Sequence, residues 1–193
     1  LWTMLAHTQG GLLNQSQLAA SLAISGQTVA RYIDLLCDLM LVRRLPAWHG
    51  NVGKRLVRAP KVYVRDGGIV HALLGLGSLE AVLSHPVAGA SWEGFVIEQL
   101  LAAAGNVEAS FYRTSHGAEA DLVLSFRNGE TWIVEIKRSS APSVSKGFHL
   151  VAADVGATKK LLVAPVSTAY PMRDGIEVMN PLSAAAKLLE LEK

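Results

Sequence analysis

Apolar and polar residues alternate in the middle of the second half of the chain, and this period of two predicts a pair of strands. The strands are expected at Leu122 to Phe126 and at Trp132 to Lys137. The Asn128-Gly129 pair between them can supply the positive φ that a tight hairpin needs. Because side chains alternate between the faces of a strand, Glu135 and Lys137 should share one side of the sheet.

A second carboxylate, Asp121, lies at the start of the first of these strands and can come alongside Glu135 if the hairpin register allows. Two carboxylates and Lys137 would form an oxygen-rich pocket suited to a hard divalent ion such as Mg²⁺. The lysine could orient water or neutralise charge on a phosphate. The alternative is an ordinary antiparallel sheet with a solvated edge face, where such alternation is common.

The first forty residues carry a helical period in two segments, which predicts a helix-turn-helix. The segment Asn14-Gln15-Ser16 is expected to cap a helix that ends near Leu22, and Ser25 to cap a second one. The buried face of the second helix is predicted to hold Val29, Tyr32, Ile33, Leu36 and Leu39.

The outward residues at the start of the second helix are Gln27, Thr28 and Arg31. In a DNA-reading helix-turn-helix such residues face bases or phosphates. Asp34 and Asp38 on the same helix fit sequence-specific binding poorly. Helix-turn-helix units also serve as packing modules, and both uses stay open.

Two short strands, at residues 41–45 and 61–65, flank a connection in the manner of a wing, so the first domain is predicted to be a winged helix over residues 1–85. Basic residues gather on this wing without any acid among them, and they would attract a phosphate backbone. A solvated surface or a face for an acidic partner is equally compatible. The cluster consists of Arg43, Arg44, Lys54, Arg55, Arg58, Lys61 and Arg65.

The second domain is predicted over residues 86–193 and starts with a helix that Ser91 caps and that ends near Ala104. Glu93 lies at the margin of the apolar stripe of this helix, where a carboxylate needs a partner, a proton or a metal. Three strands, a helix, two strands and a closing helix follow. Strands separated by a helix imply a crossover, so an α/β fold with a mixed sheet flanked by helices is expected.

Composition is typical of a folded protein, since 50% of the 193 residues are hydrophobic and 18% are charged. No apolar run reaches the roughly 18 residues of a membrane span, so no membrane partner is expected. A single cysteine, Cys37, excludes an internal disulfide and fits a cytoplasmic location. The chain begins with Leu1, from which we expect that an N-terminal part is missing.

The order of elements and acids resembles the PD-(D/E)XK nuclease-like superfamily, which includes archaeal Holliday-junction resolvases and many restriction enzymes. The motif positions are an acid on the first helix, Glu93, an Asp opening the second strand, Asp121, and Glu-x-Lys on the third strand, Glu135 and Lys137. Over nearly the whole chain, a winged helix followed by these motifs looks like the C-terminal region behind an AAA-type ATPase domain in predicted ATPases of bacteria and archaea.

This resemblance implies an upstream ATP-binding domain as the chain's own partner. No phosphate-loop motif occurs in this sequence, so that domain is expected to be missing here. ATP would bind only through that domain. The resemblance also implies that Asp121, Glu135 and Glu93 hold Mg²⁺ or Mn²⁺ and that Lys137 activates water or stabilises the phosphate.

Two functions follow as expectations. The first is a Mg²⁺-dependent endodeoxyribonuclease domain with an attached winged helix that contacts DNA. The alternative is a catalytically inactive nucleic-acid-binding or partner-docking module that regulates the ATPase, because nuclease-like folds also persist without activity. An oligomer is compatible with either function.

Overall fold

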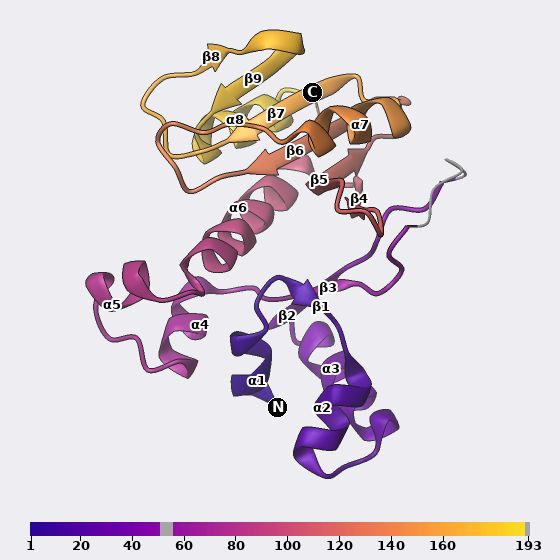
Figure 1. Cartoon of the computed structure of the whole chain (residues 1–193), viewed down its shortest axis with the longest axis vertical. Coiled ribbons are helices and arrows are strands. Elements are labelled where there is room, and N and C mark those ends of the chain that lie inside the picture. Colours follow the sequence, from indigo (N-terminus) through magenta and orange to yellow (C-terminus); the bar gives the residue numbers. More distant parts are fainter. Residues whose placement is uncertain (51–55, 192–193) are drawn as a thin grey trace. The chain divides into compact units, whose positions relative to one another are not determined.

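The computed structural model describes residues 1–50 and 56–191 (Figure 1). The predicted DNA-contacting residues Lys54 and Arg55 lie outside this described part. The chain forms two compact units. The first comprises Leu1–Leu45 and Ala59–Phe95, and the second comprises Pro46–Arg58 and Val96–Lys193.

The first unit consists of helices around a small antiparallel sheet whose strand order is β1-β3-β2. Its helices are α1 (Trp2–His7), α2 (Gln15–Leu22), α3 (Gly26–Asp38), α4 (Gly67–Leu73), α5 (Leu79–Ser84) and the start of α6 (Ala88–Ala104). Its strands are β1 (Gly11–Leu12), β2 (Val42–Leu45) and β3 (Lys61–Val64).

Both predicted N-caps of the helix pair α2 and α3 are confirmed. The Asn14 side chain accepts a hydrogen bond from the Gln17 N–H at 3.0 Å, and Ser25 Oγ accepts from the Thr28 N–H at 3.1 Å. Each cap satisfies an N–H group that has no partner within its helix. The short connection between the helices therefore ends where the sequence predicts it.

The buried face of α3 is narrower than predicted. Val29 and Ile33 are buried, but Tyr32 and Leu39 are 52% and 57% exposed. The core meets α3 along the side that carries Val29, Ile33 and Leu36, and Tyr32 and Leu39 lie about a quarter turn away from it. The prediction that these two residues are buried is therefore wrong.

The second unit is built on a mixed sheet of strand order β4-β5-β6-β7-β9-β8, in which β6, β7 and β9 run parallel and the other pairs are antiparallel. This confirms the predicted mixed α/β architecture. The elements are the end of α6, β4 (Glu108–Arg113), β5 (Glu119–Ser125), β6 (Thr131–Ile136), α7 (Lys146–Asp154), β7 (Lys159–Val163), β8 (Tyr170–Pro171), the 3₁₀ turn η1 (Arg173–Gly175), β9 (Ile176–Met179) and α8 (Pro181–Leu189).

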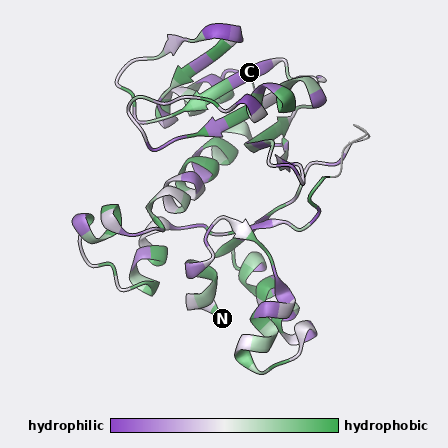
Figure 2. Ribbon diagram, viewed as in Figure 1, coloured by the Kyte–Doolittle hydropathy of each residue, from purple (hydrophilic) through white to green (hydrophobic). Residues whose placement is uncertain are grey.

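The central strands are buried on both faces. Ala120 to Leu124 in β5 and Trp132 to Ile136 in β6 form continuous buried runs, and Figure 2 shows the green of apolar residues over the sheet. On one face, Phe148 and Val151 of α7 join a core cluster with residues of β5, β6 and β7. A strand enclosed in this way can place a polar side chain in a buried position only with a partner.

Helix α6 starts earlier than predicted, at Ala88, so Ser91 is not its cap. The Ser91 N–H already donates to the Val87 carbonyl at 2.8 Å in a helical bond. Its hydroxyl is buried and lies 2.8 Å from His71 Nε2.

Within the described residues, no helix is both long enough and apolar enough to span a bilayer.

Candidate functional site

The hairpin of β5 and β6 has the register that the candidate site requires. Its antiparallel pairs run from Leu122↔Val134 to Ser125↔Thr131, and the turn closes where the Phe126 N–H donates to the Glu130 carbonyl at 2.9 Å. Gly129 takes a φ of +87°, which only a glycine adopts readily. Continuing this register by one residue places Asp121 opposite Glu135.

A β-bulge interrupts the other side of β5 at Asp121. Ser110 pairs with Val123 but Tyr112 pairs with Ala120, so Phe111 alone faces both Asp121 and Leu122. A bulge bends its strand, ends regular pairing and re-aims a side chain, and bulges are enriched beside active sites. The sequence contains no glycine or proline at this point from which the bulge could be predicted.

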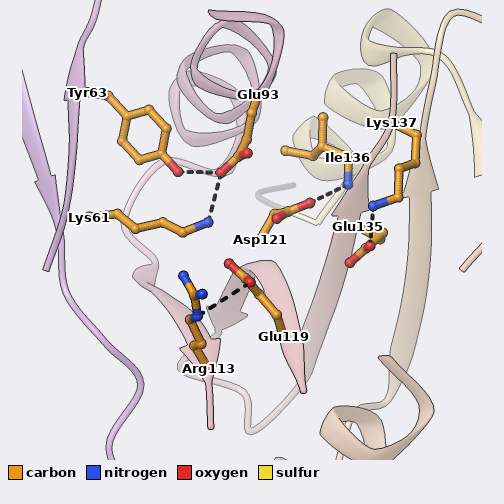
Figure 3. A network of polar contacts seen from close by, with 9 residues as sticks. All are labelled: Lys61, Tyr63, Glu93, Arg113, Glu119, Asp121, Glu135, Ile136 and Lys137. Atoms are coloured by element: carbon orange, nitrogen blue, oxygen red, sulfur yellow. Dashed lines mark hydrogen bonds and ion pairs between the residues drawn. The ribbon is translucent and has the colours of Figure 1, made fainter. Parts of the chain in front are cut away.

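The bulge directs the Asp121 carboxylate onto the backbone of β6. Its Oδ2 accepts a hydrogen bond from the Ile136 N–H at 2.8 Å (Figure 3). The β5–β6 register, if continued, would bring Ala120 opposite Ile136, but the regular pairing of β5 with β6 ends at Leu122↔Val134. The side chain of Asp121 thus satisfies a buried N–H where the ladder between the strands ends.

Glu135 and Lys137 lie on one side of β6, as the alternation predicts. Lys137 Nζ is 2.5 Å from Glu135 Oε1, in a pair whose side chains are 41% and 7% exposed. The Lys137 N–H donates to the Val163 carbonyl of the parallel strand β7 at 2.9 Å, which fixes the end of β6. The site therefore holds a buried carboxylate with an ammonium at its rim.

An ion pair at the turn end of the β4–β5 hairpin adds charge that the sequence pattern does not predict. Arg113 Nε lies 3.7 Å from Glu119 Oε2, and the two residues are register partners (Figure 3). Glu119 could have been noticed because it precedes Asp121 by two positions on one strand. Arg113 could not, because only the register of β4 brings it there.

The structure places Glu93 in the first unit, on α6, whereas Asp121 and Glu135 belong to the second. Glu93 Oε1 accepts hydrogen bonds from Lys61 Nζ at 3.0 Å and from the Tyr63 hydroxyl at 2.5 Å. Glu93, which lies beside the apolar stripe of α6, therefore has two hydrogen-bond donors as partners. Lys61, counted in the sequence among the basic residues of the wing, is a buried partner of this acid and not a surface cation.

The donor set of the second unit is small but compatible with Mg²⁺. Among residues 1–50 and 56–191, no group of three or more His, Cys, Asp or Glu side chains is arranged to hold a metal ion. Mg²⁺ is usually held by one or two carboxylates together with waters and substrate phosphate oxygens. Asp121 and Glu135 offer carboxylates of that number and kind, and the role of Glu93 as a third ligand stays a prediction.

The residues predicted to contact DNA lie in different surroundings in the first unit. Gln27 and Arg31 on α3 are exposed, and Thr28 is half-buried with its hydroxyl 2.8 Å from Ser25 Oγ. Arg43 on β2 is half-buried.

Arg44 of β2 forms an ion pair within the first unit. Its guanidinium forms an ion pair of 2.6 Å with Asp34 of α3. Asp34, an acid that fits DNA binding poorly, therefore neutralises one of the cations of the predicted wing. DNA contact by any of these residues remains a prediction.

Comparison with known proteins gives two domain matches. Residues 1–80 match the domain of unknown function DUF8612, and residues 88–184, slightly more than half of the chain, match the domain of unknown function DUF4143. The curated relatives include the uncharacterized proteins Rv2008c of Mycobacterium tuberculosis and Mb2031c of Mycobacterium bovis. Each is 41% identical over 175 residues, which is 91% of this chain and 40% of the relative.

The chain spans less than half the length of these relatives. No solved structure matches it. The match over residues 88–184 covers α6, the strands that carry Asp121 and Glu135, and Lys137 directly after β6. The chain belongs to the DUF4143 family.

Proposed function

We propose that the second unit is a nuclease-like domain that binds the phosphodiester backbone of DNA and cleaves it with Mg²⁺ or Mn²⁺. In this proposal the first unit is a winged helix, and both belong to the C-terminal part of an AAA-type ATPase. One observation carries the proposal. Asp121, turned by a bulge onto the backbone of Ile136, comes within one residue along β6 of the ion pair between the buried Glu135 and Lys137 at the rim.

The two acids are suited to hold a metal because each is fixed before any ligand arrives. Asp121 is held by the Ile136 N–H, and Glu135 by the Lys137 ammonium. A site fixed in this way loses little side-chain entropy on binding. When bound there, Mg²⁺ would supply stabilisation of the negative charge that develops on the phosphate.

Lys137 is suited to act on the substrate because it lies at the rim of the site. Its side chain is 41% exposed, so the ammonium can turn from Glu135 toward a phosphate oxygen or a water molecule. An ammonium beside the phosphate stabilises the transition state more than the ground state, since charge increases during the displacement.

The experiment is a cleavage assay on linear and branched DNA with Mg²⁺ or Mn²⁺, run beside Mn²⁺ binding measured by electron paramagnetic resonance. Asp121→Asn and Glu135→Gln should each abolish cleavage and weaken Mn²⁺ binding. Binding provides a readout that does not depend on turnover.

Matched controls are available in the same unit. Asp174→Asn and Glu108→Gln make the same chemical changes at exposed positions, and Asp174 has a φ of +62°, which asparagine tolerates. Both control variants should cleave like the wild type. Cleavage that survives in Asp121→Asn and Glu135→Gln would mean a contaminant or another site.

A second candidate function, a non-catalytic module that docks a partner or binds nucleic acid to regulate an ATPase domain, is favoured by the first unit. α3 exposes the large apolar side chains of Tyr32, Leu35 and Leu39, and Arg44 is neutralised by Asp34. If this function holds, DNA affinity falls with salt and on neutralising Arg43 and Arg44, while the carboxylate variants stay near wild type.

A further inference from the structure

The outer face of α3 carries an apolar stripe. We call Tyr32, Leu35 and Leu39 the α3 stripe, and their side chains are 52%, 52% and 57% exposed. They recur at positions i, i+3 and i+7, which is the spacing of the seam in a two-helix coiled coil. The helix spans Gly26–Asp38 and Leu39 is its C-cap, so the stripe runs along the C-terminal half of α3.

A nucleic-acid groove fits this face poorly. Base edges are read by hydrogen-bonding groups, and phosphates by cations. The α3 stripe offers three large apolar side chains, and the exposed Asp38 beside it would repel phosphate. The chemistry of the face therefore favours a protein partner with an apolar seam of its own.

The charges beside the α3 stripe indicate which protein partner the stripe can bind. Arg31 and Asp38 are seven residues apart, so they lie two turns from each other along the same edge of the seam. Both are exposed. When two identical helices pair antiparallel about a two-fold axis, the same edges meet, and a residue i that contacts j is matched by j contacting i. Arg31 of each copy then meets Asp38 of the other.

We propose that α3 pairs antiparallel with α3 of a second copy of this chain. Tyr32 packs against Leu35 of the second copy, Leu39 packs near Thr28 of the second copy, and two Arg31–Asp38 ion pairs lie along one edge of the seam. The partner is another copy because the edge is complementary to itself. A single pair of short helices buries less than a standard interface, so the dimer is expected to depend on protein concentration.

The first test is the mass of the complete chain in solution, measured by analytical ultracentrifugation over a wide range of concentrations. The wild type should shift from monomer to dimer as concentration rises. Leu35→Glu places a charge in the seam from both copies and should leave a folded monomer. Leu182→Glu, at an 81% exposed leucine in the first turn of α8, is the matched control and should dimerise like the wild type.

The second test reverses the charges. Arg31→Asp and Asp38→Arg each create like-charge contacts twice in the dimer and should weaken association about tenfold at low salt, since two exposed ion pairs are lost. The double variant restores opposite charges at both contacts and should dimerise nearly as well as the wild type.

Three outcomes overturn the proposal: a chain that is monomeric at every concentration, a Leu35→Glu variant that still dimerises, or a double variant no better than the single ones. If the monomeric chain binds DNA and Leu35→Glu weakens that binding, the α3 stripe faces nucleic acid instead. The association constants of the wild type, the three single variants and the double variant, with the Leu182→Glu control, therefore decide the question.

Discussion

Asp121 and Ile136 are joined by a hydrogen bond in which a carboxylate takes the place of a backbone carbonyl. Oδ2 of Asp121 accepts from the Ile136 N–H at 2.8 Å, one residue beyond Glu135. The same bond ends the β5–β6 ladder and fixes a candidate metal ligand. The stability of the second unit and the proposed metal binding thus both depend on the Asp121 side chain, and different substitutions can separate these two roles.

We predict that Asp121→Ala destabilises the second unit whereas Asp121→Asn changes its stability much less. Alanine leaves the buried Ile136 N–H without an acceptor, at a cost of about 1–3 kcal/mol. Asparagine keeps an acceptor oxygen at the same place but removes the charge. Urea unfolding followed by circular dichroism measures both free energies. Equal destabilisation by the two changes would contradict the role given to the hydrogen bond.

We predict that Lys137→Met lowers DNA cleavage while preserving or strengthening Mn²⁺ binding. The ammonium lies 2.5 Å from Glu135 Oε1 and competes with a cation for that oxygen. Methionine keeps the length of the side chain and removes the competing charge. Loss of Mn²⁺ binding together with cleavage would show that Lys137 only holds Glu135 in place. Glu135→Gln, measured in parallel, should lose both.

Much of the fold could be predicted from local sequence signals. The caps at Asn14 and Ser25 and the turn at Gly129 were predictable because each rests on the chemistry of one or two residues. The shared side of Glu135 and Lys137 follows from strand alternation alone. Short elements such as α1 and β1 were missed because they hold too few residues for a period to show.

What could not be predicted depends on contacts between distant segments. Tyr32 has the spacing of a core residue, yet only the direction from which the core meets α3 decides that it is exposed. The bulge at Asp121 arises from the pairing of β4, which the residues of β5 do not reveal. The bonds of Glu93 to Lys61 and Tyr63 likewise join segments about thirty positions apart in the chain.

We predict that Gly94→Ala destabilises the first unit. A Cβ at Gly94 would lie 2.9 Å from Gln9 Nε2 and 3.1 Å from Tyr63 Cδ1. The Gln9 amide cannot move aside easily, since it donates to the Val64 carbonyl at 3.0 Å and accepts from the Val64 N–H at 2.8 Å. The expected loss is about 1–3 kcal/mol in chemical unfolding.

Gly89→Ala provides the control for that prediction because it lies in the same helix, α6, with nothing within 4 Å of its added Cβ. Alanine is favoured over glycine in a helix by up to about 1 kcal/mol, so this variant should be as stable as the wild type or more stable. If both variants gain stability, the contact between Gly94 and Gln9 is looser than the structure indicates.

We predict that Tyr112→Phe makes the second unit less stable at neutral pH and less sensitive to alkali. The Tyr112 hydroxyl donates to Asp154 Oδ2 at 2.5 Å. Burial, followed by the hydrogen bond to Asp154 and the repulsion from its charge, raises the pKa of Tyr112 above its ordinary value. Removal of the hydroxyl should cost about 1.5–3 kcal/mol, as for other hydrogen bonds to charged groups.

The sign of the pH effect follows from where the proton is held. Above about pH 10, Tyr112 ionises in the unfolded chain but stays protonated in the folded one, so its contribution to stability falls as pH rises, by up to about 1.4 kcal/mol per pH unit. The difference in unfolding free energy between the wild type and Tyr112→Phe should therefore shrink from about pH 9 to about pH 11. A constant difference between the wild type and Tyr112→Phe over this pH range would mean that the phenol is not held protonated by the fold.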